Sequence, residues 1–108
     1  MQVFLDSHLA KLEATSKLER VYGPETANVI RRRLQQLHDA ESMEDLKNVD
    51  GHWEQLRYQR KHQISSRLKG KMRLLVTPRG EPHEWVENNS LVWSKIVAVE
   101  VVVSEHYK

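Results

Sequence analysis

Over the first 23 residues, a short run of apolar residues is followed by apolar residues at helical spacing. Residues 1–5, MQVFL, predict a strand, and Asp6 or Ser7 is placed to cap the helix that follows. Apolar residues then recur on one face of this predicted helix: Leu5, Leu9, Leu12, Leu18 and Val21. Gly23 ends it, because glycine readily adopts the left-handed conformation that closes helices.

A second helix is predicted over residues 24–40, where Pro24 suits the first turn. Its apolar stripe consists of Ala27, Ile30, Leu34 and Leu37. The short break at Gly23 predicts an antiparallel helical hairpin. Consecutive helical residues point about 100° apart, so we expect the triplet at 31–33 to contact solvent or a partner, not one pocket. Residues 42–49 predict a further turn capped by Ser42, with Met43, Leu46 and Val49 closing the core.

Beyond Trp53 the pattern becomes that of strands, and residues 61–76, KHQISSRLKGKMRLLV, predict a hairpin. A two-residue turn would place Arg73 on the apolar face. A three-residue turn at 69–71 keeps that face apolar and gives these pairs: Leu68 with Met72, Ser66 with Leu74, and Ile64 with Val76. The opposite face then collects Gln63, Ser65, Arg67, Arg73, Leu75 and Thr77. Arg67 and Arg73 become cross-strand neighbours, which is destabilising unless an anion lies between them.

The end of the chain predicts a loop and a last strand. Residues 80–89 are polar and turn-rich, so we expect a mobile loop in which Trp85 is available to a partner, whereas Trp53 and Trp93 pack at strand starts. Residues 94–104 are almost continuously apolar, which is typical of a central strand. The pattern predicts an α+β fold: one domain over residues 1–108, with an N-terminal strand and helical hairpin packed on a small, mainly antiparallel sheet.

The composition indicates a soluble globular protein without disulfides, thiolate metal sites or a membrane span. Apolar residues make up 39% and charged residues 30% of the chain, as in soluble globular proteins. Cysteine is absent, which excludes disulfides and thiolate metal sites and favours a cytoplasmic location. The six histidines form no i, i+4 pair, and no apolar run approaches the ~18 residues of a membrane span. We therefore expect no metal, no small-molecule cofactor and no membrane association.

Positive charge is concentrated in one segment. Residues 55–80 carry no Asp or Glu and eight basic residues: Arg57, Arg60, Lys61, Arg67, Lys69, Lys71, Arg73 and Arg79. Such segregation creates a positive potential that attracts polyanions. The alternative is a sheet edge whose charges discourage aggregation, but that device needs only a few charges. We therefore favour anion binding.

Several segments together resemble a known family. They are the helical residues 27–46, the hairpin at 62–74, the strand at 93–103 and a terminus that contains His106 and Tyr107. In this order they resemble the RelE/ParE toxin superfamily, in particular its HigB-like branch of bacterial type II toxin–antitoxin systems. Arg73 matches the arginine that follows the family's Gly-centred turn, and Met72 stands where an aromatic residue is usual. The family's Asp-Tyr-His ending aligns Tyr107 with its tyrosine and Lys108 with its histidine.

The resemblance implies a RelE-like fold and metal-independent cleavage of messenger RNA in the ribosomal decoding site. Implied partners are the ribosome, messenger RNA and a cognate antitoxin, expected to be a helix-turn-helix protein. We expect Arg73 and Arg67 to bind the phosphate, His106 to act as acid or base, and Tyr107 to stack on a base or donate a proton. Further RNA contacts are expected from Arg57, Arg60, Lys61, Lys69, Lys71 and Lys108.

The sequence leaves other classes of function open. Within the same superfamily, ParE-like members poison DNA gyrase without cutting RNA, and an inactive homologue would only bind its antitoxin. A plain RNA-binding module is the third alternative. Without the resemblance, His106 reads as an exposed residue at a chain end.

Overall fold

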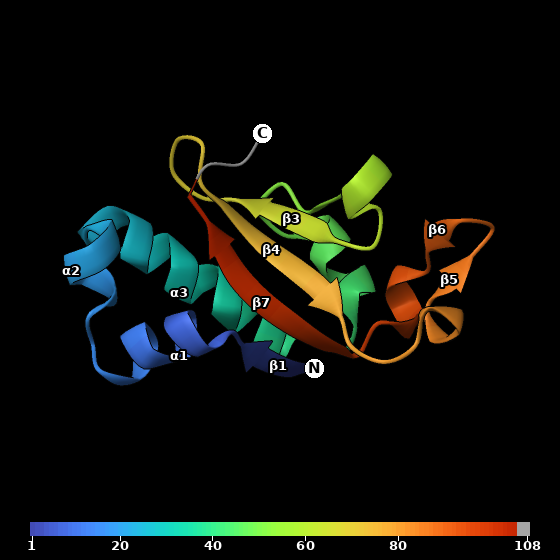
Figure 1. Cartoon of the computed structure of the whole chain (residues 1–108), viewed down its shortest axis with the longest axis horizontal. Helices are drawn as coiled ribbons and strands as arrows, with labels where there is room; N and C mark the ends of the chain where they lie inside the picture. Colours follow the sequence, from blue (N-terminus) through green and yellow to red (C-terminus); the bar gives the residue numbers. More distant parts are fainter. Residues whose placement is uncertain (106–108) are drawn as a thin grey trace.

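The computed structural model describes residues 1–105, and it has a layer of helices against a five-stranded sheet (Figure 1). Short 3-10 helices are labelled η. In chain order the elements are β1 (Gln2–Leu5), α1 (Ser7–Ala14), α2 (Leu18–Tyr22), α3 (Pro24–Asp39), η1 (Met43–Asn48), β2 (Glu54–Gln55), η2 (Tyr58–Arg60), β3 (Ile64–Arg67), β4 (Arg73–Pro78), η3 (Pro82–Glu84), β5 (Val86–Glu87), β6 (Ser90–Leu91), η4 (Trp93–Lys95) and β7 (Ala98–Ser104).

The sheet has the strand order β1-β7-β4-β3-β2. β1 runs parallel to β7, and the other neighbours in this sheet are antiparallel. The predicted α+β class is therefore confirmed, and the last strand lies between two others, as predicted. The strand predicted over residues 94–104 begins only at Ala98, because Trp93–Lys95 form η4. Figure 1 shows α1, α2 and α3 along the β1 and β7 side, while the small β5–β6 hairpin stands at the other end of the molecule.

The helix predicted over residues 6–23 is wrong in one respect, because it is broken into α1 and α2. Ser16 has a positive φ of 57°, and the Thr15 hydroxyl donates to the Lys11 carbonyl over 2.6 Å. Threonine and serine weaken helices by offering such competing bonds. Leu12 and Leu18 are six residues apart, which places them on different sides of a continuous helix. Val21, predicted to face the core, is 48% exposed.

The predicted second helix forms as α3, with Gly23 at φ 87° before it and Pro24 in its first turn. Its apolar stripe packs into the core. The expectation for the arginine triplet is wrong for Arg33, which is buried, although Arg31 is exposed and pairs with Glu19 over 3.1 Å. Burial, then the charge of Arg32, lowers the pKa of the Arg33 guanidinium.

The core lies between the helices and one face of the sheet. Side chains that are at most 1% exposed include Ile64, Leu74, Val76, Val99 and Val101 from the strands. These residues alternate along β3, β4 and β7, as the two-residue period of a strand requires. The predicted core residues Trp53, Trp93, Met43 and Leu46 are buried, although Trp93 begins η4 and not a strand. Val49 is not, because it is 43% exposed.

Trp85 also departs from its prediction, because it is only 4% exposed and is not available to a partner. Its indole nitrogen donates to the Arg79 carbonyl over 3.1 Å, and its ring forms a T-shaped pair with the His62 ring, with the centroids 5.3 Å apart. The segment 80–89, predicted as a loop, contains η3 and β5, which is the first strand of the small β5–β6 hairpin. Within the described residues, no helix is long and apolar enough to cross a membrane.

Candidate nucleic-acid interface

The sheet has a second face, turned away from the helices, which we call the outer face. Its side chains form rows across neighbouring strands, because Cα partners in a sheet point to the same side. The first row is Phe4, Glu100 and Thr77; the second is Val102, Leu75 and Ser65; the third is Ser104, Arg73 and Arg67. The outer face therefore carries charge in its first and third rows. Of the row between them, Val102 is partly exposed, whereas Leu75 and Ser65 are buried.

Arg67 and Arg73 are direct Cα partners across β3 and β4, and the three-residue turn between these strands forms as predicted. The Leu68 amide donates to the Met72 carbonyl over 3.1 Å, which closes that turn. Side chains directly opposite in such a pair have their Cβ atoms only about 5 Å apart. The two side chains therefore leave the sheet on the same face, as cross-strand neighbours.

The two arginines differ in their local contacts. A guanidinium nitrogen of Arg73 donates to the Gly70 carbonyl over 3.1 Å and to the Met72 carbonyl over 2.9 Å, so the turn orients this side chain. Arg67 is exposed, and within residues 1–105 it forms no ion pair. Glu100 projects from the same face on β7, but it pairs with Arg79 over 3.7 Å.

A buried polar cluster fixes the end of β3 next to Arg67. The Arg67 amide and the Ser66 hydroxyl both donate to the Gly51 carbonyl over 2.8 Å. The preceding Asp50 carbonyl accepts from Gln36 over 3.0 Å and from the Trp53 indole over 3.1 Å. These bonds attach the loop before β2 to both α3 and β3. This support was not predicted from the sequence, although the Asp-Gly pair at 50–51 is a turn signal.

Gly51 is required at the centre of this cluster. Its φ is +132°, and an added Cβ would lie 2.8 Å from the Ser66 hydroxyl oxygen and 2.9 Å from the Arg33 guanidinium. Both contacts are too short for any side chain larger than glycine. The Arg33 Nε and the Ser65 hydroxyl are buried without a hydrogen-bond partner among the described residues.

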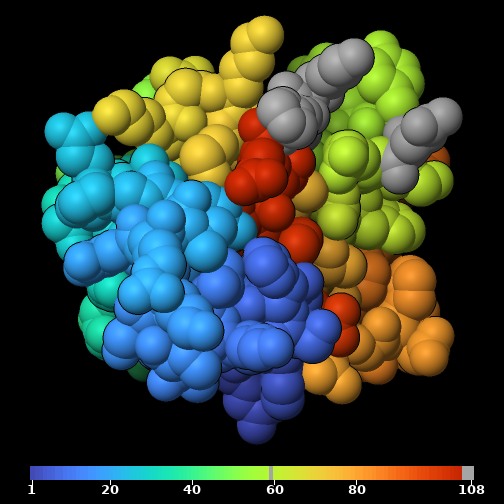
Figure 2. Space-filling view, turned by 60° about the vertical axis from the view of Figure 1, so that its left-hand side comes forward, coloured from blue at the N-terminus to red at the C-terminus, as the bar shows by residue number. Residues whose placement is uncertain are grey.

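The other predicted RNA-binding residues surround the arginine pair. Figure 2 shows the turn after β3 (yellow) and the segment around η2 (yellow-green) on either side of the end of β7 (red). The exposed residues of these two segments that were predicted to bind RNA are Arg57, Arg60, Lys61, Lys69 and Lys71. Arg60 donates to the Gln63 side chain over 3.2 Å.

Part of the positive charge is neutralised by acids from outside the basic segment. Lys69 forms an ion pair with Glu25 at the start of α3, and Arg79 pairs with Glu100. The hydrogen bond from Lys69, followed by its charge, lowers the pKa of Glu25. The positive potential expected of residues 55–80 is therefore reduced by acids at Lys69 and Arg79.

The last described residues lie beside the arginine pair, because Ser104 is the Cα partner of Arg73. The predicted acid or base His106, the predicted stacking residue Tyr107 and the predicted RNA contact Lys108 lie outside the described residues. On the helix side of this end, burial, then the carboxylates of Glu105 and Asp6, raises the pKa of Tyr22. Its phenol is therefore neutral at physiological pH.

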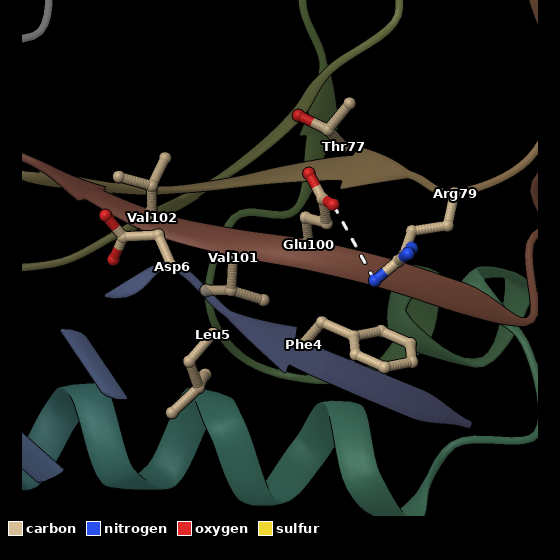
Figure 3. A pocket seen from close by; sticks show the side chains of 8 residues that line it. All are labelled: Phe4, Leu5, Asp6, Thr77, Arg79, Glu100, Val101 and Val102. Atoms are coloured by element: carbon tan, nitrogen blue, oxygen red, sulfur yellow. Dashed lines mark ion pairs between the residues drawn. The ribbon is translucent and has the colours of Figure 1, made fainter. Parts of the chain in front are cut away.

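A hollow of about 330 Å³ lies at the other end of the outer face (Figure 3). It is lined by Phe4, Leu5, Asp6, Thr77, Arg79, Glu100, Val101 and Val102. The Arg79 guanidinium lies over the Phe4 ring, 4.1 Å from its centroid. The sequence pattern gave no sign of this site, because its residues come from three strands and no local motif joins them.

The outer face offers phosphate binding by paired guanidinium groups, which grip phosphate oxygens with parallel hydrogen bonds. Among the described residues, no three His, Asp or Glu side chains are placed to hold a metal ion together. No family model, curated protein or solved structure matches the chain.

Proposed function

We propose that this chain is the toxin of a type II toxin–antitoxin system and cleaves messenger RNA on the ribosome without a metal ion. The observation that carries the proposal is the side-by-side presentation of Arg67 and Arg73 on the outer face. Two like charges in this position are stabilised when a phosphate lies between them. The α+β architecture and the order of its elements are compatible with the fold that the resemblance implies.

The reaction uses the ribose 2′-hydroxyl as nucleophile on the adjacent phosphorus. The P–O bond to the 5′-oxygen breaks, which leaves a 2′,3′-cyclic phosphate and a 5′-hydroxyl. Arg67 and Arg73 stabilise the additional negative charge on the phosphoryl oxygens in the transition state, an effect worth on the order of 10² or more in rate for one donor. In this proposal His106 transfers protons at the two oxygens, and Tyr107 stacks on a neighbouring base.

The surrounding cations contribute to binding. The exposed residues at 57–61 and in the turn after β3 contact the RNA backbone, and such contacts weaken as salt rises. A cognate antitoxin inhibits the toxin by covering the outer face. Acidic side chains on that antitoxin would complement the positive charge of this surface.

Expression of the chain in bacteria, followed by mapping of messenger 5′ ends, tests the proposal. We expect growth arrest and new 5′ ends at fixed positions within codons. The variant Arg73→Ala should relieve the arrest and remove the new ends, whereas Arg32→Ala, an exposed arginine on α3, should change neither. A folded Arg73→Ala variant that keeps full toxicity would contradict the proposal. DNA breaks in place of new RNA ends would assign the chain to the gyrase-poisoning class.

A further inference from the structure

The hollow at the first row of the outer face combines three kinds of side chain that recognise nucleobases (Figure 3). It holds an aromatic ring, a guanidinium group stacked on that ring, and a carboxylate that pairs with the guanidinium group over 3.7 Å. Its volume of about 330 Å³ is near the lower end of the range for pockets that bind small ligands. The phosphate chemistry at Arg67 and Arg73 does not use this hollow.

The charges in the hollow favour the binding of an uncharged nucleobase over that of a phosphate group. Among the described residues that line it, Arg79 is the one cation, whereas Glu100 and Asp6 contribute two carboxylates. A phosphate placed there would be repelled by these acids, unlike a phosphate at Arg67 and Arg73. An uncharged ring with N–H donors has no such penalty. The two ends of the outer face are therefore suited to different parts of one nucleotide chain.

Stacking is available on the guanidinium plane. Phe4 is 41% exposed and the Arg79 side chain 45% exposed, although they cover each other on one side. Bases splayed out of a single strand commonly stack on aromatic rings or on arginine planes. Such stacking does not choose between bases, because every base has a π face. Discrimination between the bases must therefore come from hydrogen bonds to the Glu100 carboxylate.

Glu100 is 59% exposed, and its carboxylate only accepts hydrogen bonds. Guanine presents two adjacent donors on its Watson–Crick edge, the N1–H and the N2 amine, which match the two oxygens of a carboxylate. Adenine and cytosine present a single amine there, and uracil presents one N–H between two carbonyl oxygens that a carboxylate repels. Guanine is therefore the base that this acid binds best.

The spacing between the two ends of the outer face suits one RNA strand. Arg73 and Thr77 are four residues apart on β4, which corresponds to about 13 Å along a strand. Between them lies Val102, which is partly exposed and over which a ribose can pass, whereas its neighbour Leu75 is only 4% exposed. We propose that the hollow binds a guanine of the same RNA strand whose phosphate lies between Arg67 and Arg73, an inference that rests on the proposed function.

Fluorescence anisotropy with single-stranded oligoribonucleotides tests this inference. All-2′-O-methyl strands are used, because they lack the nucleophile and stay intact. We expect a hexamer with one guanine among adenines to bind about tenfold more tightly than the all-adenine hexamer when the guanine is in the preferred position, since a good bidentate contact gives this order of discrimination. Inosine, which keeps N1–H but lacks the N2 amine, should lose most of that advantage.

Two variants identify the hollow as the source of the preference. Glu100→Gln should reduce the guanine preference to less than about twofold, because an amide has one acceptor oxygen, while all-adenine binding changes little. Glu87→Gln is the matched control, since Glu87, in the distant β5–β6 hairpin, is a similarly exposed acid and pairs with Lys95 of η4. Phe4→Leu, checked by thermal unfolding for an intact fold, should weaken the binding of every hexamer several-fold.

The outcomes separate this inference from the proposed function. Equal binding of guanine and adenine hexamers, or a preference that survives Glu100→Gln, would overturn the guanine site if binding still depended on Arg67 and Arg73. Binding that is insensitive to Arg67→Ala and Arg73→Ala would overturn the role of the arginine pair and the guanine site together. No binding at all would overturn the guanine site, whereas the proposed function on the ribosome would be overturned by the absence of growth arrest and of new messenger 5′ ends.

Discussion

The two faces of the sheet are built from the same strands and have opposite character. On β4, Leu74 and Val76 are fully buried against the helices, whereas Arg73 and Thr77, one residue away in each case, lie on the outer face. Because successive side chains of a strand point to opposite sides, neighbouring residues serve packing and recognition separately. Substitutions of the residues packed against the helices should therefore change stability, and substitutions of the exposed residues on the outer face should change binding.

The largest expected effect is on the buried face. Leu74→Ala should lower the free energy of unfolding by about 2–5 kcal/mol, because it removes buried methyl groups and leaves a cavity. Urea denaturation followed by tryptophan fluorescence measures this, since Trp53 and Trp93 are buried in the same core. Thr77→Ala, on the outer face of the same strand, should lower it by less than about 1 kcal/mol. Equal losses would mean that the faces do not differ as described.

Gly51→Ala should affect both the packed core and the outer face, because Gly51 contacts buried side chains and also bonds to the backbone of β3 at Arg67. The added Cβ clashes with buried groups and should lower the free energy of unfolding by about 1–3 kcal/mol. It should also weaken RNA binding, since the Gly51 carbonyl holds the Arg67 amide.

Gly70 provides the control for this substitution. It has φ +61°, and an added Cβ would meet nothing within 4 Å. Gly70→Asn should therefore be nearly neutral in urea denaturation, because asparagine tolerates this left-handed conformation. If both substitutions were equally mild, the close packing around Gly51 would not matter.

Arg67→Ala should raise the stability of the fold and weaken RNA binding, so the two effects should have opposite signs. Removal of one like charge should raise the free energy of unfolding by about 0.2–1 kcal/mol at low salt, and added salt should remove the gain. The same variant should bind RNA more weakly, with the slope of log affinity against log salt reduced by about 0.7. Parallel urea and anisotropy titrations at several salt concentrations measure both. A loss of stability at low salt would contradict the repulsion between Arg67 and Arg73.

The smallest expected effect is electrostatic. Lys69 lowers the pKa of Glu25, so Lys69→Met should return that pKa toward its ordinary value. Because the pKa of Glu25 is lowered in the folded protein, the Lys69–Glu25 pair stabilises the fold when the pH is above the ordinary pKa of a glutamate. This contribution is lost as the pH falls through the lowered pKa. NMR titration of the Glu25 side-chain carboxyl measures the shift. An unchanged titration would show that this exposed pair does not persist in solution.

Much of the sheet could be predicted because its signals are local. The hairpin register follows from alternation over residues 64–76 and a turn that contains Gly70, so the pairing of Arg67 with Arg73 is predictable from the sequence alone. The break after α1 was harder to predict, because Thr15 and Ser16 only weaken a helix, and packing decides whether it breaks. The burial of Trp85 could not be predicted from its polar neighbours in sequence, since it depends on contacts with Arg79 and His62.

The amino-acid pattern alone specified which strands alternate, which residue types face each other across the hairpin, and that positive charge collects there. Tertiary structure decided which basic residues find acids, how the Gly51 loop supports β3, and where the hollow forms. The reason is physical: Phe4 and Arg79 meet only because β1 and β4 both pair with β7, and a contact between residues so distant in sequence has no local signature.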